Sequence, residues 1–139
     1  MKNLLLCLTL ILTPGFAHAQ LGTHERQGLD DTKGLLKDKK QRDDFIKTDK
    51  KAQDVDAKVD ALAGSSQNKE EIYSISADVM EKLTQETNGD PDKMKVILEL
   101  ATKDPKAFYE KYFDAKSKER VRGVANEIEK KGSPAVPRK

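Results

Sequence analysis

The chain has 139 residues, of which 26 are Lys or Arg, 24 are Asp or Glu, and only 5% are aromatic. This length excludes a large multi-domain enzyme. One apolar run lies near the N-terminus and no second one follows, a pattern that argues against a transmembrane protein.

Residues 1–19 contain the three regions of a secretory signal peptide in the expected order. Lys2 supplies a positive charge, the stretch from Leu4 to Leu12 is largely apolar, and Ala17-His18-Ala19 fits the small-x-small cleavage rule. The apolar stretch is shorter than the roughly 20 residues that an uncleaved anchor needs. We therefore predict a cleaved secretory signal peptide and a mature chain that begins at Gln20.

Removal of this segment changes the composition of what remains. Lys2 is its only charged residue, so the mature chain keeps 25 basic and 24 acidic side chains. Cys7, the only cysteine, is lost, and the chain has no Asn-x-Ser/Thr sequon. A small exported protein without disulfides must be held together by packing alone. These features predict an exported protein, periplasmic or secreted, of a bacterium.

The segment after the signal begins with polar, glycine-containing sequence. Residues 20–34 are expected to form a flexible arm. Residues 35–64 are expected to form one charged amphipathic helix or short coiled coil of about 28 residues, roughly 40 Å long at 1.5 Å per residue. Its apolar stripe at heptad spacing consists of Phe45, Ala52, Val55, Val59 and Leu62. This helix either folds back to complete a core or pairs with another copy.

Residues 66–131 are expected to form a compact helical domain. Asn68 and Glu71 resemble a capping box, and Asn88-Gly89 is a stop signal. Asp90-Pro91 and Asp104-Pro105 each place an N-cap acceptor before a proline, which marks two further helix starts. A last stretch after the aromatic helix either continues it or restarts near Ser117.

The helix that starts at Pro91 is expected to be the most enclosed. Its apolar side chains surround most of its circumference: Met94, Val96, Ile97, Leu98, Leu100 and Ala101. Residues 132–139 form a basic, proline-containing tail. No segment alternates with a strand-like period, so the predicted fold class is all-α: a small helical bundle preceded by a long charged helix and a flexible arm.

The sequence offers no catalytic or metal-binding constellation, so we predict a protein that is not an enzyme and uses no cofactor or metal. His24, the only histidine of the mature chain, lies on the expected arm without suitable partners. The pairs Glu70/Glu71, Glu81/Glu86 and Glu110/Asp114 lie among lysines and are interpreted as solvated helix faces. Asp90-Pro91-Asp92 lacks the pattern of a calcium loop.

Two apolar groups are candidates for partner binding. Phe108, Tyr109, Tyr112 and Phe113 concentrate four aromatic rings in six residues, and they form either the core of the domain or an exposed stripe that anchors a partner. The second group is the helix seam formed by Val55, Val59 and Leu62. We favour the core interpretation for the aromatic residues, because so polar a domain can spare few large side chains.

Charge is unevenly distributed along the chain. Residues 67–104 carry 5 basic and 9 acidic groups, and residues 116–139 carry 8 basic and 3 acidic groups. The basic C-terminal segment is compatible with weak contact to an anionic surface, and nucleic acid is not an expected partner of an exported protein.

These features favour an exported, non-catalytic helical protein of the bacterial envelope that acts by protein–protein interaction with a partner still to be found. A holdase-type periplasmic chaperone is the alternative, and an envelope hydrolase is less well supported. The oligomeric state stays open at this point.

Overall fold

The computed structural model describes Leu4 and residues 25–131, and all regular structure in this part of the chain is α-helical. The all-α prediction is therefore confirmed. The predicted signal peptide, with the exception of Leu4, lies outside the described residues. His24 and the tail 132–139 also lie outside them. The helices are α2 (Glu25–Lys37), α3 (Lys39–Thr48), α4 (Lys50–Ala63), α5 (Ser66–Thr87), α6 (Pro91–Lys103), α7 (Pro105–Tyr112) and α8 (Ala115–Lys130).

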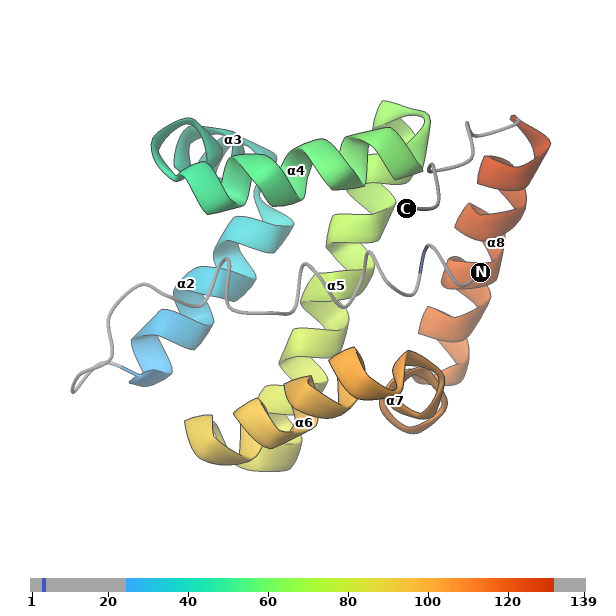
Figure 1. Cartoon of the computed structure of the whole chain (residues 1–139). Coiled ribbons are helices and arrows are strands. Elements are labelled where there is room, and N and C mark those ends of the chain that lie inside the picture. The colour runs from blue at the N-terminus through green and yellow to red at the C-terminus, as the bar shows by residue number, and fades with distance from the viewer. Residues whose placement is uncertain (1–3, 5–24, 132–139) are drawn as a thin grey trace.

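Helix α5 is the central element of the bundle. It contacts α2, α4, α6, α7 and α8. Figure 1 shows α2 and α8 on opposite sides of α5, with α4 crossing one of its ends and the α6–α7 pair crossing the other. The central position of α5 agrees with its sequence, because Ile72, Ile75, Val79 and Leu83 form the predicted stripe and all four are buried.

Three helix boundaries follow from local signals that the sequence predicts. Asn88 adopts the left-handed conformation with φ 53° and ends α5. Asp90 and Asp104 accept backbone N–H groups at the starts of α6 and α7, where prolines hold the first helical position. Asp114 caps α8 in the same way, so the last helix restarts rather than continuing α7.

The predicted capping box of Asn68 and Glu71 at the start of α5 is wrong, because the N-cap of this helix lies three residues before Asn68. Ser65 is the N-cap, and its hydroxyl accepts the N–H of Asn68 at 3.2 Å. Asn68 is itself buried, and its side-chain amide donates to the carbonyl of Ala63 at 2.9 Å. Asn68 therefore ties the end of α4 to the start of α5 rather than capping a helix.

The single long helix predicted over residues 35–64 is also wrong. The chain turns at Asp38 and Asp49, whose extended backbones separate α2, α3 and α4. Both carboxylates accept N–H groups of the following helix, so each aspartate begins a new helix. In a charged sequence, an aspartate that caps a helix cannot be distinguished from one that faces solvent. The apolar stripe at heptad spacing also continues across the break at Asp49, so it predicted one continuous helix.

The described part of the expected arm is helical. Helix α2 begins at Glu25, ten residues before the predicted start of helical structure at Leu35. Leu36 is 1% exposed and Thr32 is buried, because α2 packs along α5. Tertiary packing stabilises this segment despite its glycines and its low apolar content.

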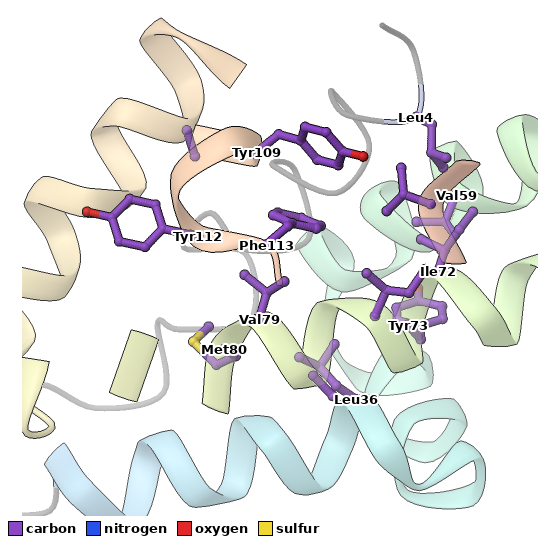
Figure 2. Packing of buried hydrophobic residues seen from close by; sticks show 14 of the residues in the cluster. Leu4, Leu36, Val59, Ile72, Tyr73, Val79, Met80, Tyr109, Tyr112 and Phe113 are labelled. Atoms are coloured by element: carbon purple, nitrogen blue, oxygen red, sulfur yellow. The ribbon is translucent and has the colours of Figure 1, made fainter. Parts of the chain in front are cut away.

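Helices from both halves of the chain contribute to one hydrophobic core. Figure 2 shows Leu36 of α2, Val59 of α4, the α5 side chains and the α7 aromatic rings in the same cluster. The predicted compact domain of residues 66–131 is therefore completed by α2 and α4, which fold back onto α5.

Candidate functional site

The four aromatic residues of the first candidate group form a packed corner at α7. Phe108 and Tyr112 have ring centroids 5.2 Å apart, and Tyr109 and Phe113 have centroids 5.1 Å apart. Phe108 also meets Phe113 edge-on at 6.0 Å. All four are 5% exposed or less. The structure thus supports the core interpretation, and neither stripe of the helix offers an exposed aromatic anchor.

The second candidate group, the α4 seam, is used within the same chain. Val59 is fully buried, Val55 is nearly so, and Leu62 is half-buried against the core. These side chains lie on the buried side of α4, which contacts α5 where it crosses one end of that helix (Figure 1). The two alternatives for this segment are therefore resolved in favour of folding back.

Helix α6 differs most from its prediction and provides the strongest candidate surface. Only Met94 and Ala101 are buried, and Val96 is 67% exposed. Among Leu4 and residues 31–131, whose side chains the structure describes, Val96 is the only large hydrophobic residue that is exposed. We define the α6 surface as exposed Val96 together with half-buried Leu100, which lies one turn further along the same side of α6.

The position of α6 explains this exposure. Its main contacts are with α5 and α7, and it lies at one end of the bundle (Figure 1). Lys95 and Glu99 are exposed beside Val96, and Lys103 pairs with Glu99 at 3.5 Å. A helix that is apolar on most sides is normally enclosed. Here it is peripheral, which leaves an apolar surface with a charged border.

A second feature, absent from the sequence prediction, is a charged cluster around Arg120 of α8. Its guanidinium donates to Glu71 at 2.5 Å, to Asp78 at 2.6 Å and to the hydroxyl of Ser74 at 2.7 Å. The three acceptors lie on one side of α5 at helical spacing. The hydrogen bond to Glu71 is the main cause of a raised Arg120 pKa, with a further contribution from Asp78. This cluster joins α8 to α5.

Arg42 of α3 forms a corresponding buried cluster. Its side chain is 1% exposed, and one of its nitrogens, Nη2, donates to both oxygens of Glu70. Nη1 donates to the carbonyl of Leu36 at 3.1 Å, and the guanidinium lies 4.1 Å from the ring centroid of Tyr73. Arg42 therefore connects the end of α2 with α3 and α5.

The contact between α4 and α5 has its own polar group. Asp56 accepts Lys69 Nζ at 3.0 Å and the Tyr73 hydroxyl at 2.8 Å. Lys69 also lies 3.3 Å from Asp60. Burial disfavours the charged form of Lys69, but the two carboxylates outweigh it and raise its pKa. This group fixes the direction in which α4 folds back.

Most of the carboxylates considered for acid–base chemistry have individual partners. Glu70 and Glu71 pair with the two arginines, and Glu110 pairs with Lys118 at 3.0 Å. The hydrogen bond from Lys37 lowers the pKa of Glu81, which is opposite to the raised pKa that a general acid requires. The interpretation of these carboxylates as solvated helix faces missed the partly buried ion pairs of Glu70 with Arg42 and of Glu71 with Arg120. Arginine burial has no signature in the local sequence.

In Leu4 and residues 25–131, no group of three or more His, Cys, Asp or Glu side chains is arranged to hold a metal ion. None of the helices in the same residues is long and apolar enough to cross a membrane. Comparisons with protein-family models, curated proteins and solved structures found no match to this chain.

Proposed function

We propose that this chain is an exported, non-catalytic helical protein of the bacterial envelope that binds another protein through the α6 surface. The observation that carries the proposal is the peripheral position of an apolar helix, with Val96 67% exposed. Apolar side chains surrounded by a polar rim are typical of protein interaction sites, and Val96 has exposed Lys95 and Glu99 beside it. Export rests on the signal-like residues 1–19.

The other apolar candidates support this choice because the fold already uses them. The aromatic rings of α7 and the α4 seam are packed into the core. The ion pairs of Arg42 and Arg120 hold the helices in fixed positions and so give the α6 surface a rigid support. A preorganised surface loses little conformational entropy when it binds.

Contact with an anionic surface is a weaker part of the proposal. Arg120 and Lys118, which contribute to the basic charge of the C-terminal segment, pair with Glu71 and Glu110. Lys116, Arg122 and Lys130 remain exposed on α8. Attraction through these exposed groups would be screened by salt.

The experiment is photocrosslinking in the native envelope from a photoreactive residue at position 95, next to Val96. We expect a specific crosslinked product that identifies the partner and that falls at least about tenfold when Val96→Asp is added, as expected for loss of an apolar anchor. Ala57→Asp, at an exposed site on α4, is the matched control and should leave the product unchanged. Equal crosslinking with all three chains would contradict the proposal.

A further inference from the structure

Helix α3 is held on the bundle by a charged side chain rather than by an apolar one. Among the residues of α3, all of which the structure describes, Arg42 is the only buried one. Its apolar residues, Phe45 and Ile46, are half-buried. Figure 1 shows α3 at the corner between α2 and α4, the helices that it mainly contacts. Arg42 connects α3 to the central helix α5, because it pairs with Glu70.

Only one member of this pair can lose its charge. The guanidinium of Arg42 stays charged at any pH at which proteins fold, whereas the carboxylate of Glu70 can take up a proton. The Glu70 side chain is 39% exposed, so protons reach it from solvent. Protonation leaves the buried Arg42 charge without a counter-charge, which is strongly unfavourable. The stabilisation from the pair is therefore present at neutral pH and is lost as the pH falls through the range in which carboxyl groups titrate, around pH 4.

The other charged clusters do not depend on a fully buried charge. The side chains of Arg120 on α8 and Lys69 on α5 are each 21% exposed, so both can contact water when their carboxylates are protonated. The helices that these clusters join also bury apolar side chains: Ala52 and Val59 on α4, and Val121 and Val124 on α8. Loss of the ion pairs in acid should therefore affect the attachment of α3 more than that of α4 or α8.

The charged groups around the pair have partners of their own. Asp43 of α3 binds Lys39, and this hydrogen bond is the main cause of its lowered pKa, with smaller contributions from Arg42 and Lys69. The remaining neighbours form pairs between helices: Lys69 with Asp56 and Asp60 of α4, Lys37 of α2 with Glu81, and Glu71 with Arg120 of α8. Glu70 is therefore the carboxylate that binds Arg42 directly.

Single extended residues join α3 to its neighbours. Asp38 has φ −96° and Asp49 has φ −119°, and each lies between two helices. Rotation at a few such residues moves a helix without unwinding the next one. The two carboxylates also accept N–H groups at the starts of α3 and α4. Protonated carboxyl groups are weaker acceptors, so acid loosens the same two positions.

We propose that α3 is an acid-sensitive latch, which opens when Glu70 is protonated. Arg42 then moves into water, and α3 turns away from α5 at Asp38 and Asp49 while the rest of the bundle stays folded. The movement uncovers the ring of Tyr73, which is buried and has the Arg42 guanidinium 4.1 Å from its centroid. The protein thus exposes additional apolar surface in acid, and this behaviour depends neither on export nor on the α6 surface.

The test is hydrogen–deuterium exchange of the full chain, followed by mass spectrometry of peptides that cover residues 39–48 and 66–87. At about pH 3.5, after correction for the intrinsic exchange rate, we expect protection of α3 to fall at least about tenfold while α5 stays protected. Glu70→Gln removes the charge without changing the size of the side chain and should produce the same loss at pH 7. Asp44→Asn, which removes an exposed carboxylate from the same helix, is the matched control and should leave α3 protected at pH 7.

A second variant separates the latch from general acid unfolding. Arg42→Met removes the charge that needs a partner, so α3 should stay protected at about pH 3.5 in this chain. Equal protection of α3 in Glu70→Gln and the unchanged chain at pH 7 would overturn the proposal. The same acid-induced loss in Arg42→Met as in the unchanged chain would also overturn it, because other carboxylates would then open α3. Loss of protection in α5 together with α3, in any of these chains, would show that no local latch exists.

Discussion

Arg42 and Glu70 form an ion pair in which one guanidinium nitrogen donates to both carboxylate oxygens, at 2.6 and 2.7 Å. The arginine is 1% exposed and the glutamate 39%, so only one of the two charges depends fully on its partner. The face of Tyr73 covers the guanidinium, while Arg42 Nε has no hydrogen-bond acceptor in the described chain. Arg42 is thus held by Glu70, the carbonyl of Leu36 and the Tyr73 ring.

Removal of Glu70 should destabilise the fold more than removal of the pair. Glu70→Ala leaves the buried Arg42 charge without its carboxylate, and we expect a loss of about 2–3 kcal/mol, below the range for fully buried pairs because Glu70 is partly exposed. The double variant Arg42→Met with Glu70→Ala should lose less, since methionine can pack in the same space. Urea unfolding of both variants measures the difference. A double variant less stable than Glu70→Ala would argue against this interpretation.

Arg120 should not tolerate replacement by lysine. Its three bonds reach Glu71, Ser74 and Asp78 from three nitrogens of one planar group. The three donors of a lysine ammonium all lie on one nitrogen and do not reproduce this geometry. We expect Arg120→Lys to lower the free energy of unfolding by about 1–2 kcal/mol. Arg122→Lys, two residues further along α8 and exposed, is the control and should lie within about 0.5 kcal/mol of the unchanged chain. Equal effects at the two positions would mean that the cluster contributes no stability.

The aromatic corner should behave as core. Phe108 is 1% exposed, and Phe108→Ala should cost about 3–5 kcal/mol, a large fraction of the stability of an ordinary domain. Tyr109→Phe keeps the ring and loses only a hydroxyl that lies 3.4 Å from the carbonyl of Lys118, so it should cost less than about 1 kcal/mol. Thermal melting followed by circular dichroism distinguishes the two. A Tm for Phe108→Ala equal to that of the unchanged chain would place this ring outside the core.

Asp114 should make stability depend on acidic pH. The backbone N–H of Ser117 donates to its carboxylate and lowers its pKa, so the ionised form is favoured in the folded chain. This contribution is fully present above the unfolded value of about 3.8 and is lost as the pH falls through the lower folded value. Asp114→Asn keeps an acceptor without the charge. Urea unfolding should therefore show a difference between the two chains near neutral pH that disappears in strong acid, whereas a constant difference would contradict the cause assigned here.

Sequence patterns predicted the elements whose signals are local. The two Asp-Pro helix starts, the stop at Asn88-Gly89 and the buried stripe of α5 depend on neighbouring residues alone, and the structure has them as predicted. The breaks at Asp38 and Asp49 were missed because a capping aspartate and a solvated one have the same sequence context. Together, the two breaks allow α4 to fold back across one end of α5 (Figure 1).

Features that depend on distant contacts could not be predicted in this way. Helix α6 has the composition of an enclosed helix, but its exposure is set by its place at the end of the bundle. The burial of Arg42 depends on Glu70 and Tyr73, which lie on another helix. The candidate surface therefore changed from the α4 seam and the aromatic corner to α6, the one apolar helix that the core leaves partly uncovered.

The most direct test of the central claim is the affinity of the partner captured by crosslinking for three purified chains: unchanged, Val96→Asp and Ala57→Asp. Both substitutions are at exposed sites, so Tm should be the same for all three within about 2 °C. We predict that Val96→Asp weakens binding at least about tenfold while Ala57→Asp leaves it unchanged. Equal affinity of the three chains, at equal Tm, would show that the partner does not bind through α6.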